Sequence, residues 1–189
     1  MTSTMRNPWQ DLPLNEPFVL PDDRAIADEF NASAIDNVKL HLELLPEPFL
    51  GCPDATVVLL NLNPGYKPED QQRHHNPEFI ARSRGNLVHR PVAYPFFLLN
   101  PDIPTSGYWK RKLGRLIESV GIDVVARNIL CVEYFPYHSK KYQRGQTQLP
   151  SQQYGFSLVR QAIDRQAIIV LLRSERYWCE AVHDLASYP

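Results

Sequence analysis

Three short apolar runs constrain the fold of this chain more than any other feature of its sequence. Residues Ala55–Leu62, Asn128–Tyr134 and Ala167–Leu172 are almost continuously hydrophobic, and segments of helical periodicity lie between and after them. Such runs are typical of strands whose two faces are both covered, whereas a strand with one wet face alternates between apolar and polar residues. The pattern predicts an α/β protein with a three-layer α/β/α arrangement around a mainly parallel central sheet.

The other expected elements are less sharply marked. Helical patterns cover four segments, residues 22–30, 108–120, 151–164 and 175–186. The alternation from Val38 to Leu44 predicts a half-buried strand. The proline-bearing segments 46–54 and 66–107 show no clear periodicity and are expected to form loops.

Length and composition limit the class of protein. The 189 residues suggest one α/β domain over residues 22–189, preceded by an extended arm over residues 1–21 that holds four prolines. The 17 Pro against 8 Gly exclude a collagen-like chain. No apolar run approaches the roughly 20 residues of a membrane helix, and the first residues show no secretory pattern. The three cysteines are widely spaced, so we expect reduced thiols in a cytoplasmic protein. We also expect a monomer.

The formal net charge of −1 conceals two charged segments of opposite sign. Residues 1–56 hold 3 basic and 10 acidic residues, a net −7, whereas residues 67–144 hold 13 basic and 7 acidic residues, a net +6. The net charge near zero excludes a protein that is basic throughout and coats nucleic acid. The basic middle either forms an ordinary solvated surface or faces a phosphate-bearing ligand.

Polar residues follow each of the three apolar runs, where a parallel sheet binds its ligands. The sequence NLNPGY places Asn61 and Asn63 before a turn that includes Gly65 and Tyr66, and an Asn at a strand end can orient a water molecule or a substrate amide. A plain strand-ending turn is the alternative interpretation. These residues form the first candidate constellation.

The second and third constellations follow the later runs. Glu133, His138 and Ser139 crowd the end of the second run, and His138 is a candidate general acid or base. Arg173 follows the third run at a strand-to-helix junction that suits an anion. A solvent-exposed His and simple helix capping are the alternatives for these two places.

The middle of the chain adds aromatic and basic residues. Phe96 and Phe97 lie downstream of Arg84 and Arg90 and are candidates for stacking on a nucleobase, or else for the core. Adjacent His residues at 74 and 75 point apart, and the sequence holds no HExxH, GxGxxG or P-loop motif. Neither a metal site nor a cofactor is therefore predicted.

The segment NLNPG at the end of a buried strand resembles the first motif of the uracil-DNA glycosylase superfamily. Asn63, Pro64 and Gly65 match the Gly-Ile-Asn-Pro-Gly pattern of its mismatch-specific branch, whereas Asn61 and Leu62 replace the first two residues. The resemblance implies a uracil-DNA glycosylase-like fold. It also implies that Asn63 orients the attacking water and that Phe96 or Phe97 stacks on a flipped base.

Two features depart from the family's pattern. The family's second motif ends in an Asn that reads the base, and Glu133 lies near that place; an ionised Glu accepts hydrogen bonds but does not donate them. The family's last motif follows a further strand and carries His and Ser. Either that strand lies outside these 189 residues, or His138 takes its role, or the chain has no glycosylase activity.

The function expected from this resemblance is hydrolysis of the N-glycosidic bond of a damaged or mismatched nucleobase in DNA, single- or double-stranded. Contacts to the DNA backbone are expected from basic residues of the middle segment, Arg82, Arg84, Arg90, Lys110 and Arg111. Two other functions stay open: a hydrolase of free nucleosides or nucleotides, and a non-catalytic nucleic-acid or nucleotide-binding module.

Overall fold

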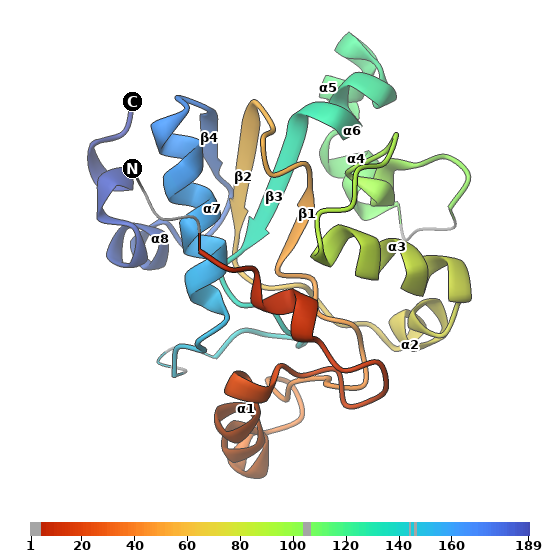
Figure 1. Ribbon diagram of the computed structural model, residues 1–189, viewed down its shortest axis with the longest axis vertical. Coiled ribbons are helices and arrows are strands. Elements are labelled where there is room, and N and C mark those ends of the chain that lie inside the picture. Colours follow the sequence, from red (N-terminus) through yellow and green to blue (C-terminus); the bar gives the residue numbers. More distant parts are fainter. Residues whose placement is uncertain (1–4, 104–106, 144, 146) are drawn as a thin grey trace.

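The computed structural model describes residues 5–103, 107–143, 145 and 147–189 as a mixed α/β protein around a four-stranded open sheet (Figure 1). The strands are β1 (Phe49–Gly51), β2 (Val57–Asn61), β3 (Ile129–Glu133) and β4 (Ile168–Leu171), in the order β1-β3-β2-β4. β2 pairs in parallel with both β3 and β4, and β1 runs antiparallel to β3. The expected α/β class is confirmed, and the sheet is mixed.

The three apolar runs form β2, β3 and β4, as predicted. Successive residues of a strand point to opposite faces, and the central strands follow this rule closely. Val58 and Leu60 of β2 belong to one buried hydrophobic cluster, whereas Leu59 between them belongs to another. The continuous apolar character of β2 is therefore explained by a hydrophobic cluster on each face of the sheet.

The same interpretation is wrong for β4. Within the described residues, β4 is an edge strand that pairs only with β2, and Ile168 is 64% exposed. Val170 and Leu171 are also exposed. A continuous apolar run can therefore mark an uncovered edge strand as well as a buried one.

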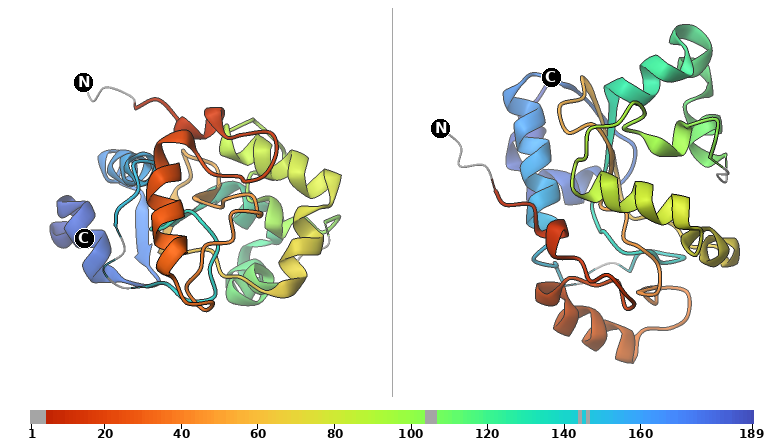
Figure 2. Two further views of the ribbon diagram at one scale, coloured as in Figure 1. Left: turned by 90° about the horizontal axis from the view of Figure 1, so that it is seen from below. Right: turned by 45° about the vertical axis from the view of Figure 1, so that its right-hand side comes forward.

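Eight α-helices surround the sheet in the described part of the chain. They are α1 (Pro21–Ser33), α2 (Pro68–His74), α3 (Pro77–Leu87), α4 (Tyr108–Lys112), α5 (Gly114–Val120), α6 (Ile122–Asn128), α7 (Gln152–Asp164) and α8 (Glu175–Ala181). Figure 1 shows α7 and α8 on the β4 side, α3 to α6 on the β1 side and α1 below the sheet, and the two views of Figure 2 agree. None of the described helices is both long and apolar enough to cross a bilayer.

The strand expected from Val38 to Leu44 is wrong. Leu40, Leu42 and Leu44 are buried, but their segment is held by bonds to loops and side chains instead of a ladder. The side chain of Asn31 bonds both the N–H and the carbonyl of Leu40, at 2.8 and 2.9 Å. Alternating burial therefore also arises in an irregular segment whose polar backbone groups find other partners.

Both segments that were expected to be loops contain regular structure. Residues 46–54 contain β1, which begins directly after Pro48 and ends at Gly51, where φ is +112° and a Cβ atom would lie 2.1 Å from the carbonyl oxygen of Ile129. Residues 66–107 contain α2 and α3, and each of these helices begins with a proline. Asn76 caps α3 by accepting bonds from two backbone N–H groups.

The expected helix over residues 108–120 is broken. It divides at Leu113 into α4 and α5, and the separate helix α6 follows after Gly121. The last predicted helix is also shorter, because α8 ends at Ala181 and a 3-10 helix continues over His183–Ser187.

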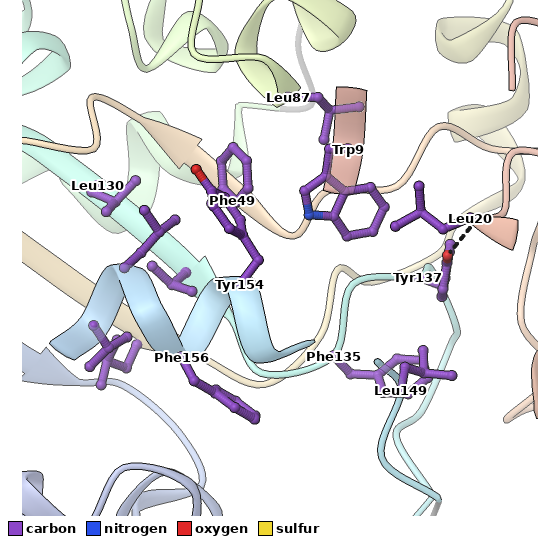
Figure 3. Close-up of a cluster of buried hydrophobic side chains, with 14 of the residues drawn as sticks. Trp9, Leu20, Phe49, Leu87, Leu130, Phe135, Tyr137, Leu149, Tyr154 and Phe156 are labelled. Atoms are coloured by element: carbon purple, nitrogen blue, oxygen red, sulfur yellow. Dashed lines mark hydrogen bonds between the residues drawn. The ribbon is translucent and has the colours of Figure 1, made fainter. Parts of the chain in front are cut away.

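Residues 5–21, the described part of the predicted extended arm, contribute buried side chains to the core. Trp9 is 2% exposed and packs in one hydrophobic cluster with Tyr137, which follows β3 (Figure 3). The Tyr137 hydroxyl accepts a bond from the Leu20 N–H at 3.1 Å and donates to Asp23 of α1 at 2.8 Å. Asp23 also accepts a bond from the Ser151 N–H, and burial raises the pKa of this carboxyl. One hydroxyl thus connects the arm, α1 and the loop after β3.

Replacement of Tyr137 by Phe should lower the free energy of unfolding by about 1–3 kcal/mol, because the Leu20 N–H and Asp23 each lose a buried partner. Urea titration at pH 7 measures the change. Tyr177→Phe is the matched control, because its hydroxyl forms no hydrogen bond in the described structure, and it should stay within about 0.5 kcal/mol. Equal effects of the two substitutions would contradict the role of this hydroxyl.

Candidate functional site

A cavity of about 360 Å³ lies beyond the carboxyl ends of β2 and β3, where parallel sheets bind ligands. Its volume is within the range of small-molecule sites. The segment before β1, the loops after β2, β3 and β4, helix α2, the 3-10 helix Phe97–Leu99 and the start of α4 supply its walls. The lining includes Glu47, Asn61, Asn63, Gly65, Tyr66, Lys67, Asp70, Arg73, Leu98, Tyr108, Trp109, Glu133, His138, Lys140 and Arg173.

Asn61 and Glu133 form a pair in the wall of the cavity. They are direct neighbours in the parallel register of β2 and β3, and Asn61 Nδ2 donates to Glu133 Oε1 at 2.9 Å. Glu133 is 8% exposed, and its second oxygen, Oε2, is buried without a hydrogen-bond partner in the described structure. Burial raises the pKa of this carboxyl to about 8; Glu47 adds to the shift, and Asn61 and Arg173 oppose it.

Asn63 is held in one orientation by the loop after β3. Its Nδ2 donates to the carbonyl oxygens of Pro64 and Ser139, at 3.1 and 3.3 Å, and to Ser139 Oγ at 3.0 Å. Backbone carbonyl oxygens only accept, so the NH₂ side of the amide must face them. Asn63 Oδ1 accepts no hydrogen bond from the described residues and is left for a ligand or a water molecule. Ser139, a predicted substrate contact, is buried and serves to position Asn63.

His138 lines the cavity but uses both ring nitrogens on the backbone. Nδ1 lies 2.8 Å from the Gly65 carbonyl oxygen, and Nε2 lies 3.0 Å from that of Leu45. Its side chain is buried, and His74 packs edge-on against it at 5.1 Å between ring centroids. In this arrangement neither nitrogen is free for proton transfer to a substrate. His138 instead ties the turn after Asn63 to the segment that precedes β1.

Glu47, His74 and His138 offer three donor atoms within 4.8 Å of one another, as a metal site requires. Their hydrogen bonds do not fit one. His74 Nδ1 accepts the Leu45 N–H at 3.0 Å, so a neutral ring carries its proton on Nε2, whereas a histidine that ligates a metal usually donates through its second nitrogen. Burial lowers the pKa of His74 to about 2 and keeps the ring neutral. We interpret the cluster as structural.

Basic side chains also line the cavity, beside the polar residues Asn61, Asn63 and Glu133. Lys67, Lys140 and Arg173 are exposed, and Arg73 pairs with Asp70 at 2.8 Å. The Lys140 ammonium lies 5.8 Å from the centre of the Tyr66 ring. Predicted site residues Asn61, Asn63, Gly65, Tyr66, Glu133, His138 and Arg173 are thus brought together at one cavity.

The apolar wall differs from the expected one. Leu98, Tyr108 and Trp109 line the cavity, whereas Phe96 is wholly buried behind Trp109, with 5.2 Å between their ring centroids. Phe97 is also buried and lines a second cavity. The structure therefore places neither predicted stacking residue against the candidate site.

The predicted DNA-backbone residues are divided among three places. Arg82 and Arg90 line the second cavity, of about 460 Å³, next to the turn that precedes β2 at the opposite end of the sheet. Arg84 Nη2 donates to two carbonyl oxygens of the arm, at 2.6 and 3.0 Å. Lys110 and Arg111 lie on α4, directly after two residues that line the candidate site.

Several residues of the cavity were missed from the sequence. Tyr108 and Trp109 stand directly before Lys110 and Arg111, and an aromatic pair beside a basic run is a usable signal for a nucleic-acid surface. No comparable local pattern marks Glu47 or Leu98, because tertiary packing alone brings them to the cavity. Glu47 precedes β1, which pairs with β3, and Leu98 lies in the 3-10 helix Phe97–Leu99 beside α4.

Comparisons with known proteins assign this chain to no family. No family model, no curated protein and no solved structure matches it. Its function must therefore be argued from the geometry of the site itself.

Replacement of Glu133 by Gln should change how stability depends on pH. An acid whose pKa is raised on folding stabilises the native state most at pH values below its unfolded pKa, and this contribution is lost as pH rises toward about 8. The unfolding free energy of E133Q minus that of the parent protein should therefore increase with pH, by up to about 1.4 kcal/mol per unit between pH 5 and 8. Urea titrations at several pH values measure it. A difference independent of pH would contradict the raised pKa.

Proposed function

We propose that this protein hydrolyses the N-glycosidic bond of a damaged or mismatched nucleobase in DNA. The fixed orientation of Asn63 carries the proposal. Because Pro64 and Ser139 take the amide hydrogens, Oδ1 is the atom left to accept a hydrogen bond from a water molecule. A water held in this way is oriented for attack before the substrate arrives, which is how a positioned group lowers an activation barrier.

In the proposed reaction the water oxygen bonds to the anomeric carbon of the sugar while the bond from that carbon to the base nitrogen breaks. The electron pair of the broken bond stays on the base, so negative charge develops there until the base accepts the proton that the attacking water releases. Lys140 and Arg173 line the cavity with positive charge that stabilises this negative charge. A base taken out of its stack needs an apolar surface, for which Leu98 and Trp109 are available.

A phosphate-bearing substrate is supported by the basic residues around the cavity. Lys67, Lys140 and Arg173 line it, and Lys110 follows the aromatic residues of α4. These residues replace Arg82, Arg84 and Arg90 as the proposed contacts to the DNA backbone. The proposal extends to a three-layer, uracil-DNA glycosylase-like fold, which is supported by the separate hydrophobic clusters on the two faces of β2.

Oligonucleotides that contain uracil, hypoxanthine or a mismatch should acquire abasic sites on incubation with the protein. Asn63→Ala should lower the rate about 100-fold, the loss typical of a removed catalytic positioning group. Asn37→Ala is the matched control, because Asn37 is exposed and its side chain forms no hydrogen bond in the described structure. If the parent protein forms no abasic sites in any of these substrates, the proposed activity is wrong.

Binding to DNA should weaken steeply with salt. If three phosphates are neutralised, the affinity should fall about 20- to 40-fold between 50 and 200 mM salt, whereas binding of a free nucleoside should barely change. Arg173→Gln should reduce the slope of log affinity against log salt by about one phosphate contact. If the slope for the parent protein is near zero, the result would instead favour a hydrolase of free nucleosides.

A further inference from the structure

The pair formed by Asn61 and Glu133 has an unusual hydrogen-bond balance. Glu133 Oε1 accepts from Asn61 Nδ2, but Oε2 is buried and has no partner in the described structure. If the carboxyl were ionised, Oε2 would be a buried, charged and unsatisfied acceptor, which is costly. If the carboxyl is protonated on Oε2, the same atom becomes a hydrogen-bond donor at the wall of the cavity.

The surroundings of Glu133 favour the protonated form. The ionisable groups that act on it or are affected by it come from several elements: Glu47 before β1, Cys131 on β3, Tyr108 on α4 and Arg173 after β4. Arg173 opposes protonation, but it is exposed, whereas Glu47 and burial both favour it. With a pKa of about 8, most of the Glu133 carboxyl is protonated at pH 7.

We propose that Glu133 acts as a neutral carboxylic acid that donates a hydrogen bond to the substrate, and that the site thereby selects bases with a carbonyl group beside a ring N–H. This inference rests on the proposed function for the identity of the ligand as a nucleobase. Glu133 supplies the donor, and Asn61 Oδ1, which accepts no bond from the described residues, supplies an adjacent acceptor. Glu133 thus becomes the specificity-determining residue of the site.

The order of hydrogen-bond donors and acceptors on the edge of each base explains why the site would select uracil and hypoxanthine. Uracil and hypoxanthine present a carbonyl acceptor next to a ring N–H donor, which complements a donor from Glu133 and an acceptor from Asn61. Cytosine and adenine carry an amino donor and an unprotonated ring nitrogen at the same positions, so the amino group would face the Glu133 O–H with no acceptor between them. A buried polar group left unpaired in this way is strongly disfavoured. Ionised Glu133 would lack the O–H donor, so the preference for a carbonyl would be lost.

Calorimetric binding of 2′-deoxyuridine and 2′-deoxycytidine between pH 6 and 8.8 tests the proposal. At pH 6–7 the parent protein should bind deoxyuridine at least about tenfold more tightly than deoxycytidine, and the preference should shrink as pH rises through about 8. E133Q keeps a permanent N–H donor and should retain the preference at every pH. The parent protein and E133Q are measured with the same nucleosides, so any ionisation of a nucleoside affects both proteins equally and cancels in the comparison. Glu118→Gln, on the exposed face of α5, should behave like the parent protein.

Carbon-13 NMR of the Glu133 carboxyl in the ligand-free protein gives an independent readout. A carboxyl that is ionised at pH 7, equal or tighter binding of deoxycytidine at pH 6–7, or the same pH dependence in E133Q and the parent would each overturn the proposal. Absence of binding by either nucleoside would overturn it too. Selective binding of deoxyuridine without formation of abasic sites in DNA would instead leave this inference standing and refute the proposed hydrolysis.

Discussion

The parallel pairing of β2 with β3 is the constraint on which the candidate site depends. The register sets Asn61 beside Glu133, and the pairing continues after both strands have ended. The Tyr134 N–H donates to the Asn61 carbonyl, the Phe135 N–H to that of Leu62 and the Ser139 N–H to that of Pro64. These bonds hold the two loops side by side, so Ser139 reaches Asn63. A shift of one residue would turn Asn61 and Glu133 to opposite faces of the sheet and remove the pair.

The sequence was sufficient to predict the central strands and the polar residues at their ends. Continuous apolar runs located β2 and β3, and the rule that ligands bind at carboxyl ends brought Asn63, Glu133 and Arg173 to one cavity. The sequence was insufficient to predict elements whose structure is determined by tertiary contacts instead of by the local residue pattern. The alternation around Leu42 reflects bonds to other loops, and β1 is too short for a periodicity of its own. The prolines of residues 66–107 favoured a loop there, so α2 and α3 were not predicted, although Asn76 before Pro77 is a recognisable helix start.

Protonation states were the least predictable part of the site. From the sequence, Glu133 is an acceptor and His138 a candidate acid or base. The structure changes both interpretations. Burial favours the neutral form of Glu133, and both ring nitrogens of His138 lie against backbone carbonyl oxygens. The desolvation that raises the pKa of Glu133 depends on the packing of residues far apart in the chain, so no local motif encodes it. This raised pKa makes the fold less stable as pH rises from the unfolded pKa of the acid toward about 8.

The burial of Asn7, Trp9 and Leu20 near the start of the described chain has a consequence for the order of folding. Asn7 bonds the carbonyl of Leu87, Arg84 bonds that of Pro13, and Leu20 bonds Tyr137, which are pairs 80, 71 and 117 residues apart. Contacts between such distant residues form only after the intervening chain exists and has closed a large loop. During synthesis the segment around Trp9 must therefore leave the ribosome long before its partners and wait, with its apolar surface exposed, until residue 137 has followed.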